Sequence, residues 1–311
     1  MESSDACRHL RESNSAGAES ANRRPGGRPV TGWHPAGRKE IDEVLSFLKV
    51  REWTCVSFTS RILNHELGTH RILVDRSDDG ARKITGAVLL TNQGLVIPVL
   101  DSSGGPHFRS ELLPLISSYT HGVHSVMGVE RQVEAIDRLL GGGATEKIEY
   151  HLMTREHFNI PKPPPALGEV TIRKATSSDL KALFPLQREY EKEEVLLNPA
   201  RFNATASLLS LQRNLRKEIV YLAEREGEPV AKAGTNARGI NYFQIGGVYT
   251  VPDLRGRGLG QKVMRALMWD IAQREKHLCL FVKKGNAAAI KLYSNVGFTI
   301  RDSFAINYYR S

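Results

Sequence analysis

The sequence predicts an α/β (or α+β) fold in which a mixed central sheet carries helices on both faces. Runs with the spacing of strands alternate with runs of helical spacing, and similar orders of elements occur over residues 40–160 and 169–311. A glycine-rich turn at residues 255–260 separates a β-forming run from an amphipathic one. A chain of 311 residues is long for one domain and suits two. We therefore expect two α/β domains in tandem.

The first part of the chain divides into an arm and a domain. Residues 1–38 are rich in Ser, Gly, Arg and Pro without apolar periodicity, which predicts a disordered basic arm. Residues 39–160 are expected to form the first domain, beginning with a helix whose apolar face contains Ile41, Val44 and Leu48. Its further expected elements are strands at 71–75, 84–90 and 94–100, a helix at 107–118, a strand at 123–127, a helix at 130–140 and a strand at 146–153.

A proline-rich segment at 161–168 is expected to link the two domains, because proline supplies neither helix nor ladder donors. Residues 169–311 then form the second domain. Its expected elements are a strand at 170–174, helices at 178–190 and 204–217, strands at 219–225, 230–236 and 242–251, a helix after the glycine turn, a strand at 278–282, a helix from 286, and a closing hairpin of 298–300 and 305–309.

Composition restricts the classes of partner. The net charge of +9 permits acidic partners, including nucleic acid or a phosphate-rich cofactor, but the chain has no RNP, helix-turn-helix or finger signature. No apolar run approaches about 18 residues and no signal-like segment is present, so we expect a cytoplasmic protein without a membrane partner. Cys7, Cys55 and Cys279 lie far apart without a CxxC spacing, so neither a metal site nor a disulfide framework is expected.

The glycine-rich turn predicts a phosphate site. Gly256, Gly258 and Gly260 allow the backbone to approach a ligand closely, and a helix begins directly after them. Free N–H groups at the positive end of a helix bind phosphate. The turn lacks the Gly-Lys-Ser/Thr ending of a Walker loop, and its GxGxG spacing differs from the GxGxxG of a dinucleotide fold.

Two motifs in order carry a family resemblance. Arg255, Gly258 and Gly260 form the pattern RxxGxG, and NAAAIKLYSNVGF follows at 286–298. In this order they resemble the GNAT acetyltransferase superfamily over residues 169–311, which implies the GNAT fold and acetyl-coenzyme A as cosubstrate. The resemblance implies that Arg255 and Arg257 add positive charge at the pyrophosphate. It also implies binding of the pyrophosphate by the main-chain amides of Gly256, Arg257, Gly258, Leu259, Gly260 and Gln261.

The same resemblance assigns roles beside the turn. Gly246 and Gly247 lie in a strand interior, where glycine commonly marks a bulge. In the superfamily this strand splays from its neighbour, which implies that the backbone of Val248, Tyr249 and Thr250 binds pantetheine, with the Val248 amide facing the thioester carbonyl. Asn286 would bond the pantetheine arm and Tyr293 would protonate the departing thiolate. A plain N-cap and a core tyrosine are the structural alternatives.

The general base is not evident from the sequence. Phe281 and Gln244 occupy the places where family members carry a glutamate, which leaves an acidic cluster to act through water or to attract a cationic amine. This cluster contains Glu189, Glu191, Glu193 and Glu194.

The expected function is therefore transfer of acetyl from acetyl-coenzyme A to a primary amine by direct attack in a ternary complex. The acceptor is a protein lysine, an N-terminus or a small amine, and the oligomeric state stays open. The alternatives are an acetyl-coenzyme A-binding regulator without turnover and a nucleic-acid-associated protein.

The first domain is interpreted as a degenerate GNAT-like domain because it repeats the order of elements. Its counterpart of the phosphate turn, residues 101–108, lacks RxxGxG, so we expect it to bind coenzyme poorly or not at all. An unrelated α/β domain of similar order is the alternative.

Overall fold

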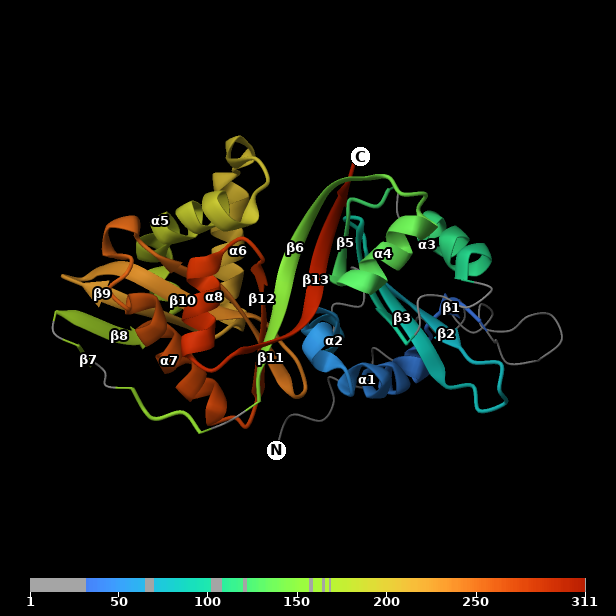
Figure 1. Cartoon of the computed structure of the whole chain (residues 1–311), viewed down its shortest axis with the longest axis horizontal. Coiled ribbons are helices and arrows are strands. Elements are labelled where there is room, and N and C mark those ends of the chain that lie inside the picture. The colour runs from blue at the N-terminus through green and yellow to red at the C-terminus, as the bar shows by residue number, and fades with distance from the viewer. Residues whose placement is uncertain are drawn as a thin grey trace, which may run out of the picture.

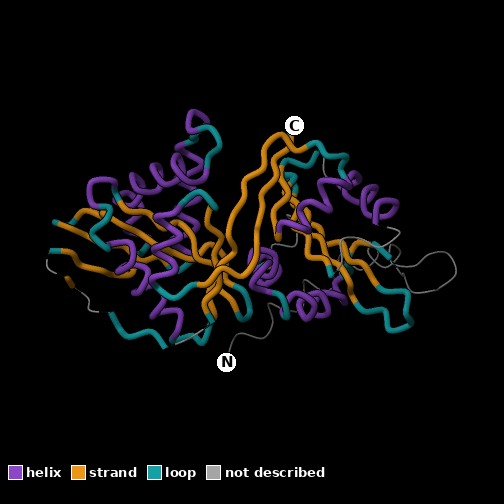
Figure 2. Tube along the Cα trace, viewed as in Figure 1, coloured by secondary structure: helices purple, strands orange, loops and turns teal. Residues whose placement is uncertain are grey.

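The computed structural model describes residues 32–64, 70–101, 108–119, 122–156, 159–163, 166–167 and 169–310. Within these residues a single mixed sheet of 13 strands runs through the molecule in the order β1-β2-β3-β4-β5-β13-β6-β12-β11-β10-β9-β8-β7. Helices flank the sheet in both lobes of the molecule (Figures 1 and 2). No helix in the described ranges is both long and apolar enough to cross a membrane.

The first half of the chain contributes the elements up to β6. They are β1 (His34–Pro35), α1 (Ile41–Lys49), α2 (Val56–Leu63), β2 (His70–Arg76), β3 (Ile84–Thr91), β4 (Leu95–Leu100), a π-helical turn (Phe108–Leu112) that leads into α3 (Leu113–Tyr119), β5 (Ser125–Val129), α4 (Glu130–Leu139) and β6 (Ala144–Arg155).

The second half contributes the remaining elements. They are β7 (Ala166–Leu167), β8 (Val170–Lys174), α5 (Leu180–Tyr190) followed by the π-helical turn η5 (Glu191–Val195), α6 (Ala204–Lys217), β9 (Val220–Arg225), β10 (Glu228–Arg238), β11 (Tyr242–Thr250), α7 (Leu259–Ala272), β12 (His277–Lys283), α8 (Ala287–Asn295) and β13 (Thr299–Tyr309).

The two halves exchange strands at the centre of the sheet. β6 belongs to the first half of the chain but pairs with β12, for example at Leu280↔Met153. β13 closes the second half but lies between β5 and β6, with Ala305 opposite both Gly128 and Glu149. Figure 1 shows β6 and β13 running side by side between the lobes. The halves therefore cannot separate without breaking a strand ladder.

Both faces of the sheet are covered, as the fold-class prediction requires. Along β3, Val88 and Leu90 pack into the cluster under α3 and α4, whereas Ala87 and Leu89 pack into the cluster with α1 and α2. Strands buried on both faces form continuous apolar runs, which explains the composition of β3.

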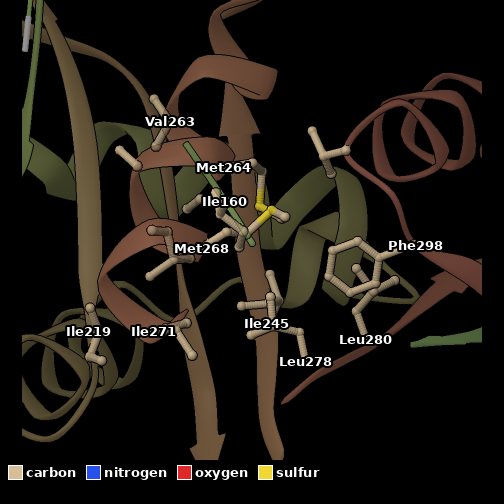
Figure 3. Packing of buried hydrophobic residues seen from close by; sticks show 14 of the residues in the cluster. Ile160, Ile219, Ile245, Val263, Met264, Met268, Ile271, Leu278, Leu280 and Phe298 are labelled. Atoms are coloured by element: carbon tan, nitrogen blue, oxygen red, sulfur yellow. The ribbon is translucent and has the colours of Figure 1, made fainter. Parts of the chain in front are cut away.

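In the second half, α7 packs on one face of the sheet through its apolar stripe (Figure 3). Val263, Met264, Leu267 and Ile271 recur at helical spacing and are fully buried. Burying each such side chain stabilises the fold by about 1.5–3 kcal/mol. The opposite face is covered by α5 and α6, whose buried side chains include Leu183, Leu211 and Leu215. The phosphate turn thus leads into a firmly anchored helix.

A buried carboxylate from the first half fixes a turn of the second. Glu52 has no exposed surface, and its side chain accepts hydrogen bonds from the main-chain N–H groups of Ile240 (2.6 Å), Asn241 (2.6 Å) and Tyr242 (3.1 Å). These groups form the turn between β10 and β11. Glu52 therefore ties the start of β11 to the other lobe.

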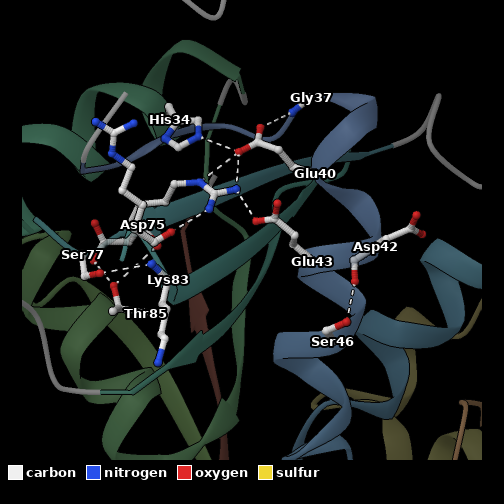
Figure 4. Close-up of polar contacts among 12 residues, drawn as sticks. His34, Gly37, Glu40, Asp42, Glu43, Ser46, Asp75, Ser77, Lys83 and Thr85 are labelled. Atoms are coloured by element: carbon white, nitrogen blue, oxygen red, sulfur yellow. Dashed lines mark hydrogen bonds and ion pairs between the residues drawn. The ribbon is translucent and has the colours of Figure 1, made fainter. Parts of the chain in front are cut away.

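An ion cluster anchors the start of the described chain on β2 (Figure 4). The Glu40 carboxylate contacts Arg76 Nη2 at 2.8 Å and His34 Nε2 at 3.1 Å, and it accepts a hydrogen bond from the Gly37 N–H at 2.8 Å. Burial raises the pKa of Glu40, but the Gly37 and Arg76 bonds outweigh it and lower this pKa to about 2. The cluster keeps β1 and α1 together.

Several elements differ from the sequence expectations. The closing segment is one continuous strand, β13, and not a hairpin, because β5 and β6 supply ladder partners on both of its sides. The expected arm, residues 1–38, includes β1 and the buried Trp33; residues 1–31 lie outside the described residues. The sequence analysis missed α2 altogether. Ile160, just before the expected linker, is buried in the core of the second half.

Candidate active site

The two parallel strands β11 and β12 pair only at their beginnings. Their ladder consists of Tyr242↔His277, Phe243↔Leu278 and Gln244↔Cys279. Beyond this point β12 continues along β6 and β11 continues along β10, so a wedge opens between them. The ladder of β10 and β11 shifts register between Lys232 and Gly234, opposite the two glycines of β11. Gly247 has a φ of +62°, a left-handed conformation that favours glycine.

The wedge ends at the glycine-rich turn before α7. Gly256 and Gly258 have φ angles of +77° and +74°, and a Cβ atom on either would point into open space. Gly258 is the N-cap of α7, and the N–H groups of a helical first turn have no partner within the helix. A Cβ on Gly260 would lie 2.9 Å from Leu292 Cδ1, so α7 and α8 approach closely here. Unpaired amides therefore face a space bounded by two helices.

A groove of about 500 Å³ follows this path. It is lined by Glu193, Glu194, Val248, Tyr249, Thr250, Leu254, Arg255, Gly256, Gly258, Leu259, Gly260, Gln261, Asn286, Ala288, Ala289, Lys291, Leu292, Tyr293 and Asn295. Among the described residues to which the resemblance assigns cosubstrate binding or catalysis, Arg257 is the one that does not line it, and of the acidic cluster Glu189 and Glu191 do not line it either. The sequence-based selection thus converges on one groove.

Asn286 and Tyr293 both reach this groove from α8. The Asn286 side chain caps α8 by accepting a hydrogen bond from the Ala289 N–H (3.0 Å), and its Nδ2 donates to Glu194 Oε1 (3.1 Å). Tyr293 is partly buried beside Phe298, with ring centroids 6.1 Å apart. Burial raises the pKa of Tyr293, and the nearby Tyr190 and Glu194 raise it further. Its phenol therefore keeps its proton at neutral pH.

Arg255 stands at the edge of the groove, where Glu193 holds it. Its Nη2 contacts Glu193 Oε2 at 2.7 Å, and its Nε donates to the Thr250 carbonyl at 3.0 Å. Tyr249 donates its hydroxyl to the other oxygen of Glu193 at 2.7 Å, and burial together with this bond raises the pKa of Tyr249 to about 12. For Glu193 burial acts to raise the pKa, but the bonds from Arg255 and Tyr249 lower it overall. Glu193, one member of the acidic cluster, is thereby held beside the end of β11.

A second cavity of about 250 Å³ adjoins the groove. Both are lined by Glu194, Val248, Asn286, Ala289 and Tyr293. Its further walls are Tyr150, Tyr190, Val195, Asn236, Ile245, Gly246, Gly247, Phe281, Val282, Lys283, Ile306 and Tyr308. The shared residues include Val248 and Tyr293, to which the resemblance assigns roles at the reacting end of the thioester.

The four glutamates of the acidic cluster have different surroundings. Glu189 pairs with Arg188 (2.6 Å), and Glu191 accepts a hydrogen bond from Gln187 (2.7 Å). Glu194 instead lines the groove, the second cavity and an outer cleft of about 810 Å³. Its Oε2 also lies 3.7 Å from Lys283 Nζ. Glu194 is therefore the member of the cluster that lines both the groove and the second cavity.

Sequence reasoning missed the walls that come from the exchanged strands. Tyr150 lies on β6, and Ile306 and Tyr308 lie on β13. No local pattern marks them, because their place in the site depends on which strands pair across the centre of the sheet. Within the described ranges, no group of three or more His, Cys, Asp or Glu side chains is placed to hold a metal ion.

Comparison with known proteins gives a match to one family model and several solved structures of similar fold. Residues 230–308, which contain β11, the glycine turn and α8, match the model of the FR47-like protein family. A Drosophila protein of known structure has a TM-score of 0.66 at 17% identity, over 90% of this chain and 99% of its own. Comparison with curated proteins gives no match.

Two further solved structures have the same fold. A GCN5-related N-acetyltransferase from Sphaerobacter thermophilus has a TM-score of 0.59 at 12% identity, over 88% of this chain and 94% of its own. A tandem GNAT protein from the clavulanic acid biosynthesis pathway has a TM-score of 0.56 at 13% identity, over 88% of this chain and 97% of its own. Residues 230–308 thus match the FR47-like family, and the chain has the fold of these solved structures, with a mixed α/β sheet like that of a tandem GNAT protein.

Proposed function

We propose that the protein is an N-acetyltransferase that moves acetyl from acetyl-coenzyme A to a primary amine by direct attack. One observation carries the proposal: the wedge between β11 and β12 leads to an amide-lined helix start, with Asn286 and Tyr293 along the same groove. We place the enzyme in the cytoplasm, where acetyl-coenzyme A is available to it. The assignment to acyl transfer also accords with the acetyltransferase names of proteins that share the fold.

The groove can bind the cosubstrate through main-chain groups. The amides of Gly256, Gly258 and Gln261 at the start of α7 bind the pyrophosphate, supported by the positive end of the helix dipole. The backbone of β11 beyond Gln244 has no ladder partner on the β12 side, so its polar groups are available to pantetheine. The Val248 N–H then donates to the acyl oxygen, where negative charge develops during attack.

Two side chains that line both the groove and the second cavity carry the proton transfers of the reaction. Glu194 accepts the proton of the attacking ammonium, directly or through one water, because it borders both spaces. The nitrogen of the free amine forms a bond to the acyl carbon, and as the C–S bond breaks this nitrogen loses its second proton to water. Tyr293, which also borders both spaces, donates its proton to the departing sulfur. The Tyr293 phenolate regains its proton from water after the thiol leaves.

The second cavity, which we take as the acceptor cavity, favours a small amine or the end of a long side chain. Its volume of about 250 Å³ and its aromatic walls, Tyr150, Tyr190, Phe281 and Tyr308, suit a short chain more than a folded surface. An ammonium group would meet the Glu194 carboxylate and aromatic faces there. A protein lysine, an N-terminus and a free amine all present such a group.

The proposal is tested by measuring release of coenzyme A thiol with a panel of peptides, polyamines and small amines. We expect turnover with at least one primary amine, and a kcat about 100-fold lower for Tyr293→Phe, since a positioned acid contributes on that order. Tyr221→Phe is the matched control, because Tyr221 lies on β9 and contacts Asp270 (3.3 Å) instead of the groove. Binding without turnover for any amine would contradict the proposal and favour a coenzyme-binding regulator.

A further inference from the structure

A buried lysine lies directly behind the wedge. Lys232, in the middle of β10, is 4% exposed and lies opposite Tyr249 of β11 in the ladder. Lysine is almost never fully buried unless it is paired. Within the described part of the chain, however, no carboxylate lies within ion-pair distance of Lys232 Nζ. The side chain therefore needs an explanation other than an ion pair.

Its ammonium is held by three neighbours. Nζ donates to Gln187 Oε1 at 2.9 Å and to the Gly247 carbonyl at 3.1 Å, and it lies 4.7 Å from the centre of the Tyr190 ring. Gln187 and Tyr190 belong to α5, which covers this face of the sheet. The bond to Gly247 is the contact that links Lys232 to the groove.

The Gly247 carbonyl and the Val248 N–H belong to one peptide unit. A donor at the carbonyl oxygen polarises the whole unit and strengthens the N–H at its other end as a hydrogen-bond donor. We propose that Lys232 is a positioning residue for acyl transfer, which fixes the Gly247–Val248 peptide and strengthens the Val248 N–H that faces the acyl oxygen. This inference rests on the proposed function.

The two glycines of β11 keep this peptide accessible to Lys232. A Cβ on Gly247 would lie 3.2 Å from Lys232 Nζ, and a Cβ on Gly246 would collide with the side-chain amide of Asn236. Gly247 also has the left-handed φ of +62° that turns its carbonyl out of the regular ladder. The bulge therefore presents its carbonyl to the lysine, and the N–H of the same trans peptide points the opposite way.

The charge of Lys232 changes near neutral pH. Burial lowers the pKa of Lys232 to about 7, and Glu191 acts in the opposite direction. The other titratable groups facing it are Tyr190 from α5 and Tyr249 from β11. Burial raises the pKa of both phenols, so they stay protonated. A charged donor forms a stronger hydrogen bond than a neutral one, so the polarisation of the peptide is larger below about pH 7.

The test compares wild type with Lys232→Met. We expect kcat to fall about 10-fold and the KM for acetyl-coenzyme A to stay within about twofold, since weakening an oxyanion donor costs less than the loss of one. Lys276→Met is the matched control, because Lys276 Nζ also donates to a main-chain carbonyl, that of Ile240 (2.7 Å), away from the groove. For this control we expect both constants to stay within about twofold.

The infrared C=O stretch of bound acetyl-coenzyme A, recorded without acceptor, reports the polarisation itself. We expect it to lie below the free value in wild type and in Lys276→Met, and to return toward the free value in Lys232→Met. A wild-type kcat in Lys232→Met, a loss confined to KM, or an unchanged stretch would overturn the inference.

A measurement on wild type alone covers the case in which Lys232→Met does not fold. Raising the pH from about 6 to about 8.5 should move the bound C=O stretch toward its free value, because Lys232 loses its charge in that range. A stretch that does not respond to pH would overturn the inference. Turnover in wild type with loss in Tyr293→Phe keeps the proposed function intact whatever Lys232 does, so the two failures can be told apart.

Discussion

Both halves of the molecule open their sheet at the corresponding place, and in the second half a groove of about 500 Å³ follows this opening. β4 and β5 pair in parallel only at Leu95↔Ser125 and Val96↔Val126, as β11 and β12 pair only at their beginnings. In the first half, Gln132 of α4 donates to the Leu100 carbonyl at 2.8 Å and is buried. This bond joins the strand end to the helix across the opening.

The second half keeps the corresponding space free. There Asn286, the N-cap of α8, caps its own helix with its side chain and contacts Glu194 instead of bridging to the strand end. A splayed pair of strands becomes a candidate site only where the strand end is followed by unpaired amides and the helix leaves room. The first-half counterpart of the glycine turn was expected at residues 101–108, of which residues 102–107 lie outside the described residues.

The halves are nevertheless parts of one structure. β6 and β13 carry Tyr150, Ile306 and Tyr308 to the acceptor cavity, and Glu52 caps a turn of the opposite lobe. We propose that the first half is a degenerate GNAT-like domain that completes the site instead of binding coenzyme. The following predictions test this difference in roles, in order of decreasing effect.

The largest expected effect is on stability. Glu52→Ala should lower the free energy of unfolding by about 4 kcal/mol, because it leaves the N–H groups of Ile240, Asn241 and Tyr242 without their acceptor, each at a cost of about 1–3 kcal/mol. Urea unfolding measures it. Glu134→Ala, an exposed carboxylate of the first half, is the control and should cost at most about 1 kcal/mol. Two separate unfolding transitions of the lobes in wild type would show that Glu52 does not couple the lobes.

The next effect is on cosubstrate binding. Gly258→Val should weaken acetyl-coenzyme A binding about 100-fold, because the side chain strains the left-handed backbone and fills the groove. Gly142→Val is the matched control: its φ of +73° is close to the +74° of Gly258 and its surroundings are equally open, but it lies in the first half. Equilibrium dialysis compares them. Equal acetyl-coenzyme A binding by the two variants would show that the glycine turn is not part of the binding site.

A smaller effect concerns the Glu40 cluster of the first half. Because the pKa of Glu40 is lowered from 4.5 to about 2 in the folded state, its stabilisation is present above pH 4.5 and is lost as pH falls toward 2. Unfolding of wild type and Glu40→Gln should differ by about 2 kcal/mol at neutral pH, and this difference should shrink through that window. A difference that grows toward low pH would contradict the assignment.

The smallest effect concerns the acceptor. Tyr308→Ala should raise the KM for the amine about 10-fold and leave the KM for acetyl-coenzyme A unchanged, because Tyr308 lines the second cavity and not the groove. Tyr309 is the control on the same strand, since its hydroxyl bonds Asp137 of α4 at 2.8 Å and not the cavity. If Tyr309→Ala changed the amine KM as strongly, the wall supplied by β13 would lose its specific role.

The sequence indicated the parts of the site that depend on local chemistry. The glycines at 256, 258 and 260 signal an unusual backbone, and Asn286 and Tyr293 recur at helical spacing, so their shared groove could be anticipated. The strand exchange could not be, because a strand pattern encodes which face is buried and not which distant strand lies beside it. The closing segment was wrongly expected to be a hairpin for this reason. Lys232 carried no signal either, since its burial depends on α5 packing over β10.

The most direct test is the stoichiometry of acetyl-coenzyme A binding by titration calorimetry on the full chain. The difference between the halves predicts one cosubstrate bound per chain, through the groove of the second half. No binding, or two equivalents per chain, would contradict it.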